Sequence, residues 1–296
     1  MATHPTIHWF RQDLRLADNP AFDAAAQGGR ILPLYILDGV NPGKDSPGAA
    51  SAVWLHHALA SLSKSLKGKL SLYQEDPLSI LLALCKKSSA KRVTWNRCYE
   101  PWAIERDKKI KQALRHEGIE VVSCNGSLLW EPWEITKSDE TPYRVFSPFY
   151  RNGCLNAEPP REPLDPPSDY TLVRPLKGAL TLDQLKLLPK TGWDKAMLAS
   201  WEISEEGARS RFNSFLKEGI SHYKEGRNLP AKPYVSRLSP HLHFGMISPN
   251  TLWHGALQEG NSDNIDHFLS ELGWREFSYN LLYYNPTLRT KNIQSK

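Results

Sequence analysis

The stretch TIHWFRQDLRLADNPAF, residues 6–22, begins with a short run rich in β-branched and aromatic side chains, which is typical of a buried strand. Arg11, Asp13 and Arg15 follow at alternate positions, and residues 18–20 have the composition of a helix start. A strand, a polar loop and a helix in this order form the first unit of an α/β domain. We interpret the charged loop as a structural salt-bridge cluster. The alternative is that it holds a nucleotide or contacts a second domain.

Strand-like and helix-like runs then alternate as far as residue 126. The strand-like runs are RILPLYIL, KLSLYQ, RVTWN and IEVVSCNG, and the helix-like runs are SAVWLHHALASLSKSLKG, PLSILLALCKKSSA and PWAIERDKKIKQALRHEG. This alternation predicts an α/β domain with a doubly wound parallel sheet, which we assign to residues 1–132. Such sheets bind ligands beyond the carboxyl ends of their strands. Pro33 interrupts the second strand and is expected at an edge or at a strand start.

A proline-rich segment separates this domain from the rest of the chain. Residues 157–177, AEPPREPLDPPSDYTLVRPLK, contain six prolines in 21 positions, so neither a helix nor an interior strand is expected there. We assign residues 133–198 to an inter-domain linker. The helical patterns at and beyond its end are LTLDQLKLL (residues 180–188), residues 204–226 and TLWHGALQEG (residues 251–260). No strand pattern returns, and residues 199–296 are therefore predicted to form an all-α domain.

The composition is that of a soluble globular protein of two domains. The net charge of +5 permits an anionic partner such as nucleic acid without requiring one, and ten tryptophans favour a partner with flat rings. The four cysteines have neither disulfide-like nor metal-like spacing, so we expect reduced thiols and no metal site. No secretory signal is visible, and no apolar run approaches the roughly 20 residues that cross a bilayer. A cytoplasmic location is expected.

The stretch ELGWREFSYNLLYYNP, residues 271–286, has an unusual distribution of polar and aromatic side chains. Glu271, Trp274, Arg275 and Ser278 follow i, i+3, i+4, i+7 spacing, so they share one face of a helix. An acid, a large flat ring and a cation side by side suit a planar ligand with hydrogen-bonding groups. A buried tryptophan flanked by a Glu–Arg pair is the alternative interpretation.

A second polar cluster lies in NLPAKPYVSRLSPHLHFGMISPNTLW, residues 228–253. Ser236, Arg237 and Ser239 precede a proline that starts a helix, and hydroxyls, free backbone N–H groups and a fixed cation are the groups that bind a pyrophosphate. A helix cap with a surface arginine is the simpler alternative. His241 and His243 do not share a helix face and have no acidic or cysteine partner nearby, so we interpret them as packing residues.

These segments together resemble the DNA photolyase and cryptochrome flavoprotein family. The resemblance rests on residues 9–22, on NRCYEPW (residues 96–102), on TPYRVFSPFYR (residues 141–151), on VSRLSPHLHFGMISP and on ELGWREFSYNLLYYNP, which occur in the family's order over nearly the whole chain. The family's domain order is also the one inferred above. The resemblance implies light-driven repair of UV-induced cyclobutane pyrimidine dimers in DNA, by electron transfer from reduced FAD.

The resemblance also implies roles for individual residues. By their place in the motifs, the FAD-binding residues are Tyr223, Val235, Ser236, Arg237, Leu238, Ser239, Phe268, Glu271 and Arg275. The residues that contact DNA are Arg227, Glu271, Trp274 and Arg275, and the catalytic pair is Glu271 and Trp274. An antenna chromophore, folate or deazaflavin, is implied for the first domain, but the motifs assign it no residues. A monomer is expected.

The family's helical domain continues well beyond the segment that matches residues 271–286. The resemblance therefore implies a chain that is truncated at its C-terminal end, with residues 199–296 as the N-terminal part of an incomplete FAD-binding domain. Three hypotheses follow. The chain is a photolyase-type enzyme, a cryptochrome-like blue-light photoreceptor without repair activity, or a truncated and catalytically inactive partial chain.

Overall fold

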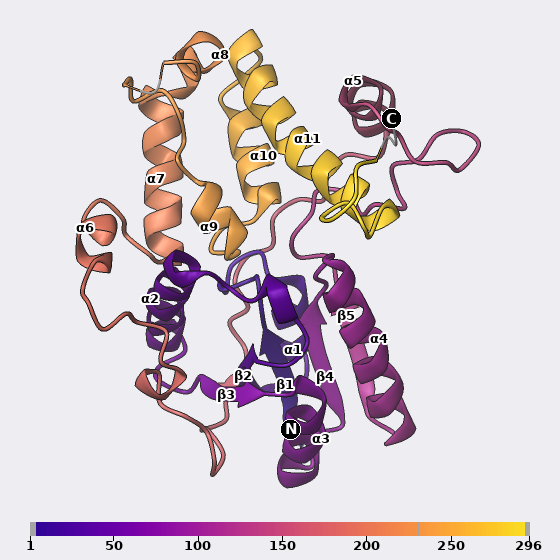
Figure 1. The fold of residues 1–296 in the computed structure, drawn as a ribbon, viewed down its shortest axis with the longest axis vertical. Coiled ribbons are helices and arrows are strands. Elements are labelled where there is room, and N and C mark those ends of the chain that lie inside the picture. Colours follow the sequence, from indigo (N-terminus) through magenta and orange to yellow (C-terminus); the bar gives the residue numbers. More distant parts are fainter. Residues whose placement is uncertain (1–3, 230, 294–296) are drawn as a thin grey trace.

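The computed structural model describes residues 4–229 and 231–293, and the first half of the chain forms a parallel sheet (Figure 1). Within the described residues the strands are β1 (Thr6–Phe10), β2 (Arg30–Asp38), β3 (Ser71–Glu75), β4 (Arg92–Asn96), β5 (Glu120–Cys124) and β6 (Thr171–Leu172). Their order is β3-β2-β1-β4-β5, with β6 beside β2, and each of these pairings is parallel. The predicted doubly wound α/β fold is confirmed.

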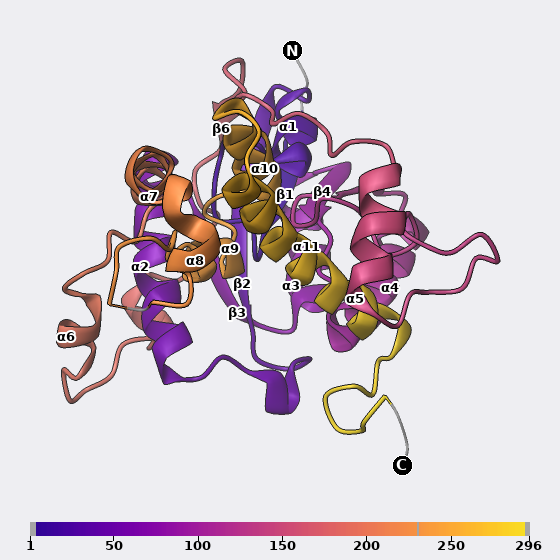
Figure 2. The same cartoon turned by 90° about the horizontal axis from the view of Figure 1, so that it is seen from above.

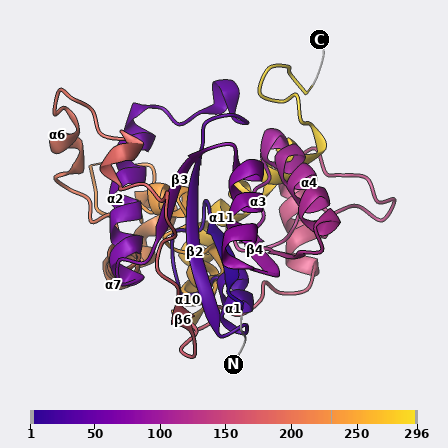
Figure 3. The same ribbon diagram turned by 90° about the horizontal axis from the view of Figure 1, so that it is seen from below.

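Helices cover both faces of this sheet (Figure 3). On one face lie α1 (Pro20–Ala26) and α2 (Ala49–Ser65), and on the other lie α3 (Pro77–Ser88) and α4 (Pro101–His116); a short turn, η1 (Gly43–Asp45), precedes α2. The helix start predicted at residues 18–20 is correct, because the Asn19 side chain accepts a hydrogen bond from Phe22 N at 3.0 Å. On each face, a separate cluster of buried apolar side chains packs between the sheet and its helices.

Pro33 lies within β2, an interior strand, and yet it occupies a local edge. The carbonyls of Gly29 and Ile31 accept hydrogen bonds from the β6 side, so Pro33, two residues further on, faces the same side. There β6 pairs with β2 only as far as Ile31, and β3 begins to pair at Leu34. The missing N–H of the proline therefore falls in a gap between two neighbouring strands, where no ladder bond is lost.

The linker combines short turns with extended chain. Its elements are α5 (Phe146–Pro148), the π-helical turn η2 (Phe149–Gly153), η3 (Cys154–Asn156), β6, η4 (Asp183–Leu185) and α6 (Asp194–Leu198). The helix predicted for residues 180–188 is wrong, since only the η4 turn forms. Leu180 N donates to the carbonyl of Leu72 at 2.8 Å, and Lys186 adopts a left-handed conformation with φ +52°, which stops the turn.

The second half of the described chain is helical (Figure 2). It contains α7 (Glu205–Glu218), η5 (Ile220–His222), α8 (Tyr223–Gly226), α9 (Ser239–His243), α10 (Pro249–Gln258) and α11 (Asp263–Tyr284). The pattern over residues 204–226 forms three short elements rather than one helix, because the chain turns at Gly219. Within residues 4–229 and 231–293, no helix combines the length and apolar character needed to span a membrane.

The charged loop after β1 joins the two halves. Arg15 is buried and donates to the carbonyls of Asp18, Gly126 and Gly245, the last at 2.9 Å in the helical half. Gly245 has φ +65°, and a Cβ there would lie 2.0 Å from the carbonyl oxygen of Gln12. The loop is structural, as interpreted, but Arg15 contacts backbone carbonyls rather than carboxylates, and an ion pair of the loop is that of Arg11 with Asp107 at 2.6 Å. The bond to Gly245 also brings the loop into contact with the helical half.

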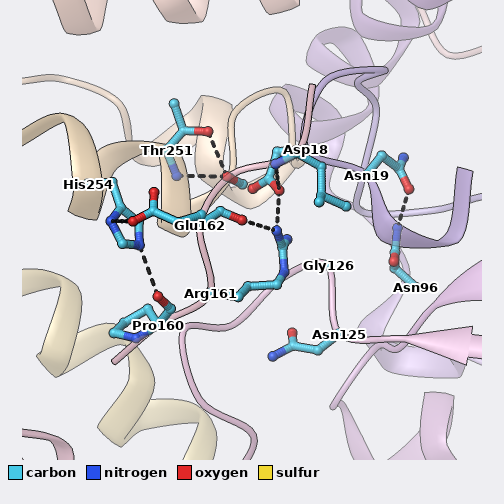
Figure 4. A network of polar contacts seen from close by, with 12 residues as sticks. Asp18, Asn19, Asn96, Asn125, Gly126, Pro160, Arg161, Glu162, Thr251 and His254 are labelled. Carbon is cyan, nitrogen blue, oxygen red and sulfur yellow. Dashed lines mark hydrogen bonds and ion pairs between the residues drawn. The ribbon is translucent and has the colours of Figure 1, made fainter. Parts of the chain in front are cut away.

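A polar network extends this junction to the linker (Figure 4). Asp18 pairs with Arg161 of the proline-rich segment, and Asn96 Nδ2 donates to Asn19 Oδ1 at 2.7 Å. His254 of α10 contacts the carbonyl of Pro160 at 3.0 Å. The proline-rich segment is thus fixed to both halves along its path, although it contains little regular structure.

Candidate functional site

Helix α11 carries the residues that the spacing placed on one face. Glu271, Trp274, Arg275 and Ser278 are all at least partly exposed, whereas the intervening Leu272, Gly273, Glu276 and Phe277 are buried. The predicted shared face is therefore present, and we call these four exposed residues the α11 stripe. Trp274 is 45% exposed, so the alternative of a buried tryptophan is wrong.

The acid of the stripe is paired with a cation from a neighbouring helical segment. Glu271 and Arg227 form an ion pair in which each side chain is about one third exposed, and the guanidinium of Arg227 also lies 5.9 Å from the ring of Tyr223. The nearby carboxylate and its hydrogen bond raise the pKa of Arg227 above its usual value. Both charges remain accessible to a solvent-borne partner.

Arg275, the cation of the stripe, contacts a residue of its own helix rather than one of a neighbouring segment. Arg275 Nη1 donates to Glu276 Oε1 at 2.8 Å, and its guanidinium lies 5.0 Å from the ring of Tyr279. Glu276 is buried, and its Oε2 accepts from the backbone N–H of Leu129 at 2.9 Å. Arg275 thus links the stripe to the buried carboxylate that holds α11 against residues 129–130, at the end of the α/β domain.

A cavity of about 830 Å³ opens in the helical half next to Arg227, and we call it the arginine pocket. Its lining residues are Arg211, Ser214, Phe215, Glu218, Arg227, Ala231, Lys232, Pro233, Val235, Ser236 and Arg237. Four of these side chains are cationic and one is acidic, so the pocket favours an anion. Three residues that the motifs assigned to FAD, Val235, Ser236 and Arg237, lie in this wall.

Arg237 is held in an unusual conformation at this wall. Its backbone φ of +51° is in the left-handed region, which is uncommon for a residue other than glycine. Its guanidinium lies 4.9 Å from the centre of the Trp201 ring, and Arg211 lies 4.7 Å from the same ring. Both guanidinium groups thus contact one ring, and both residues belong to the wall of the arginine pocket.

The remaining assigned residues lie around this pocket without lining it. Ser239 is exposed at the start of α9, while the side chains of Leu238, Tyr223 and Phe268 are buried. The ring of Phe268 lies 5.0 Å from Phe215 and 5.4 Å from Tyr223. Their roles toward a ligand stay predictions. His241 is fully buried with its ring 5.1 Å from Trp54, which confirms its interpretation as a packing residue. His243 is exposed, so the same interpretation is wrong for it.

A second cavity, of about 730 Å³, lies beyond the carboxyl ends of β1 and β2, and we call it the edge pocket. Its wall joins both halves and includes Trp9, Arg11, Tyr35, Asp38, Trp102, Arg106, Phe244, Ser278 and Leu282. Arg106 pairs with Asp38 at 3.1 Å and lies 5.0 Å from the ring of Trp102. From the sequence, Arg11 was considered for a nucleotide and Ser278 for a planar ligand, and the other residues of this wall were not singled out. The position of Asp38 at a strand end is the signal that predicts such a site.

Metal ligation has no candidate in the part of the chain that is described. Within residues 4–229 and 231–293, no three His, Cys, Asp or Glu side chains come together in a way that would hold a metal ion.

Comparison with known proteins identifies the family. The sequence model of the DNA photolyase family matches residues 6–168. A deoxyribodipyrimidine photo-lyase of Agrobacterium fabrum is 41% identical over 99% of this chain, and Cryptochrome-1 of Arabidopsis thaliana is 29% identical over 95% of it. The crystal structure of a class III photolyase from Agrobacterium tumefaciens superposes with a TM-score of 0.92 at 40% identity, over 99% of this chain.

The match covers only part of each relative. The chain spans 62% of the length of the Agrobacterium fabrum photo-lyase, 43% of Cryptochrome-1 and 61% of the class III photolyase chain. The family model matches more than half of the 296 residues. Over 99% of the chain, the backbone follows that of a solved photolyase. The chain belongs to the DNA photolyase family.

Proposed function

We propose that this chain binds FAD in its helical half and that the α11 stripe receives a UV-damaged pyrimidine dimer extruded from DNA, for light-driven repair. The observation that carries the proposal is the pairing of a half-exposed Trp274 with Glu271 one helical turn away, beside a cationic pocket. The relatives named photo-lyases support a repair enzyme.

The arginine pocket fits the diphosphate of FAD. Arg211, Arg227, Arg237 and Lys232 outnumber its single carboxylate, Glu218, so two phosphate charges are favourable there. At the flavin end, Phe268 is buried among other rings and Glu271 is paired with Arg227. The described residues therefore support the diphosphate end of an FAD site more directly than its flavin end.

The stripe supplies what an extruded dimer requires. Two fused pyrimidines stack poorly in a duplex, so their extrusion needs less free energy than that of intact bases. The indole of Trp274 offers them a flat apolar surface, and the Glu271 carboxylate accepts a hydrogen bond from a base N–H. Reduced FAD, when bound, would supply an electron on absorbing blue light and would take it back once the two bonds of the cyclobutane ring have opened.

Arg227 connects binding of the DNA backbone with binding of the extruded base at the α11 stripe. Its guanidinium, one third exposed, is available to a backbone phosphate, and a phosphate contact competes with its pair to Glu271. As Arg227 turns to the DNA backbone, Glu271 is released to face the extruded base. The ion pair between these two side chains is thus the resting arrangement of a site that opens on DNA.

The edge pocket is our candidate for the antenna chromophore that the family resemblance implies. It lies where doubly wound sheets bind ligands, and Trp102 and Tyr35 offer rings to a planar folate or deazaflavin. A chromophore bound there contacts both halves of the chain.

The experiment uses the purified 296-residue chain, FAD and an oligonucleotide that contains one thymine dimer. We expect a flavin absorption band in the blue on reconstitution. We expect Trp274→Ala and Glu271→Gln to weaken dimer binding by about tenfold or more, as the loss of a base–aromatic stack predicts. Trp133→Ala is the matched control, because Trp133 is also 45% exposed but lies outside the stripe. Equal binding and blue-light repair in wild type and both stripe variants would refute the assignment.

A cryptochrome-like photoreceptor is the second candidate, and it is favoured by the similarity to Cryptochrome-1 over 95% of this chain. It predicts FAD binding without dimer repair. Blue-light illumination of the reconstituted chain with the dimer oligonucleotide separates the two functions, because only the repair enzyme restores the intact thymines. A chain that binds no FAD at all supports the third hypothesis, an inactive partial chain.

A further inference from the structure

We propose that Phe146, on the linker, is a positioning residue that holds the Trp274 indole so that its outer face receives an extruded pyrimidine. The inference rests on the proposed function and adds a residue from outside the helical half to the base site. The evidence is a column of three nearly parallel rings, Tyr150, Phe146 and Trp274, which we call the ring column.

The geometry of the column is that of stacked rings. The centres of the Phe146 and Trp274 rings are 3.8 Å apart and their planes are inclined by 13°. Phe146 and Tyr150, four residues apart in consecutive helical turns, are 5.5 Å apart and also inclined by 13°. The ring planes are therefore nearly parallel from Tyr150 through to Trp274, although the two residues are far apart in the sequence.

The inner end of the column is fixed. Tyr150 is buried, and it packs so closely on α11 that a Cβ on Gly273 would lie 2.5 Å from its ring. Phe149, the residue before it, lies 5.1 Å from Phe277, and so anchors the same turn to the helix core. Because Gly273 directly precedes Trp274, the contact that seats Tyr150 also sets the height of the indole above the linker.

The outer end of the column is open. Phe146 covers one face of the indole, and Phe277 meets it edge-on at 5.9 Å with planes at 74°. The 45% exposure of Trp274 is consequently concentrated on the face opposite Phe146. A base that stacks on that face becomes the fourth ring of the column, with its plane set by Phe146.

Trp133 shows what an exposed indole looks like without this support. It is equally exposed, but its nearest ring, Tyr283, is inclined by 58°, and Arg97 lies 5.9 Å from its centre. No parallel ring lies beneath it among the described residues. An exposed indole in this protein therefore need not have a parallel ring beneath it, and the Phe146 ring beneath Trp274 is a specific feature of the stripe.

The test compares variants of Phe146 in binding to the thymine-dimer oligonucleotide, measured by fluorescence anisotropy, with iodide quenching of tryptophan emission as a readout that needs no DNA. We expect Phe146→Leu, which keeps apolar volume without a flat ring, to weaken dimer binding about fivefold, and Phe146→Tyr to restore it to within about twofold, as expected for the loss and return of stacking. Iodide is expected to quench a larger share of the emission in Phe146→Leu than in Phe146→Tyr.

The outcomes separate this inference from the proposed function. If Trp274→Ala loses dimer binding while Phe146→Leu and Phe146→Ala bind like wild type, Phe146 does not position the indole and the inference is overturned. If Trp274→Ala also binds like wild type, the stripe is not the base site and the proposed function fails together with the inference. Trp133→Ala, which removes the other equally exposed indole, is expected to leave dimer binding unchanged; a loss as large as that of Phe146→Leu would overturn the assignment to the column.

Discussion

The charged loop after β1 and the α11 stripe contain the same kinds of side chain, and the structure uses them in opposite ways. Arg15 of the loop is buried, and its donors contact three backbone carbonyls, of Asp18, Gly126 and Gly245. Arg227, beside the stripe, contacts one carboxylate and stays one third exposed. Buried groups whose hydrogen bonds are complete stabilise the junction, whereas the half-exposed pair retains capacity for a ligand.

The largest expected effect is therefore in the loop. Arg15→Ala would leave the carbonyls of Asp18, Gly126 and Gly245 without their donor, and we expect the free energy of unfolding to fall by about 3–5 kcal/mol, as for other broken buried networks. Urea unfolding followed by circular dichroism measures it.

The control for Arg15 is Arg209→Ala, which removes an exposed partner 3.4 Å from Glu205. Exposed i, i+4 pairs contribute little, so we expect a change below about 0.5 kcal/mol. Similar losses in Arg15→Ala and Arg209→Ala would contradict the distinction between buried and exposed charges drawn here.

The same contrast appears within α11, where Glu276 is buried and Glu271 is not. Burial raises the pKa of Glu276 to about 7, and the lowering effects of Arg275 and of the backbone N–H groups of Leu129 and Trp130 do not offset it. The ordinary pKa of a glutamate side chain is 4.5, so between pH 4.5 and pH 7 the folded state binds more protons than the unfolded state.

Glu276 should consequently make the protein less stable as the pH rises through this range, by about 3 kcal/mol in total. Glu276→Gln is expected to remove that fall. Burial lowers the pKa of His8 to about 4, which makes stability rise from about pH 4 to pH 6.5 in both proteins, so the difference between wild type and variant isolates Glu276. Parallel pH profiles of urea unfolding in the two proteins would show that Glu276 does not titrate in this way.

Most of the fold follows from local patterns. The strands and helices up to residue 124 match the predicted alternation, because each run has a clear periodicity and its connectors are short. The helix prediction for residues 180–188 failed because the spacing of its leucines is compatible with more than one secondary structure. Leu180 hydrogen-bonds to the backbone of β3, and this tertiary contact competes with helix formation.

The site was predictable only where it is local. The stripe follows from the spacing of Glu271, Trp274 and Arg275 on one helix. Phe146 could not be found in this way, because no periodicity links residue 146 to residue 274. The same holds for Arg211 of the arginine pocket and for Trp201, whose ring both Arg211 and Arg237 contact, because packing of distant segments brings these residues together.

A small effect on stability is also expected for the Arg227–Glu271 pair, and it tests whether the stripe is free to bind. A double-mutant cycle with Arg227→Gln and Glu271→Gln should give a coupling of about 0.5 kcal/mol that fades at high salt, since both side chains are partly exposed. The pair of Arg92 and Glu120, 2.8 Å apart on the sheet and also exposed, is the matched control.

A small coupling for Arg227 and Glu271 has a functional consequence. In the proposed function a DNA phosphate and a base N–H each take one member of the pair, so the free energy that holds the two charges together would oppose that binding directly. A coupling near that of Arg92 and Glu120 leaves the stripe able to open on DNA. A coupling above about 2 kcal/mol would put the pair in the same class as the buried loop, and Glu271 would then be a structural residue rather than a contact for the damaged base.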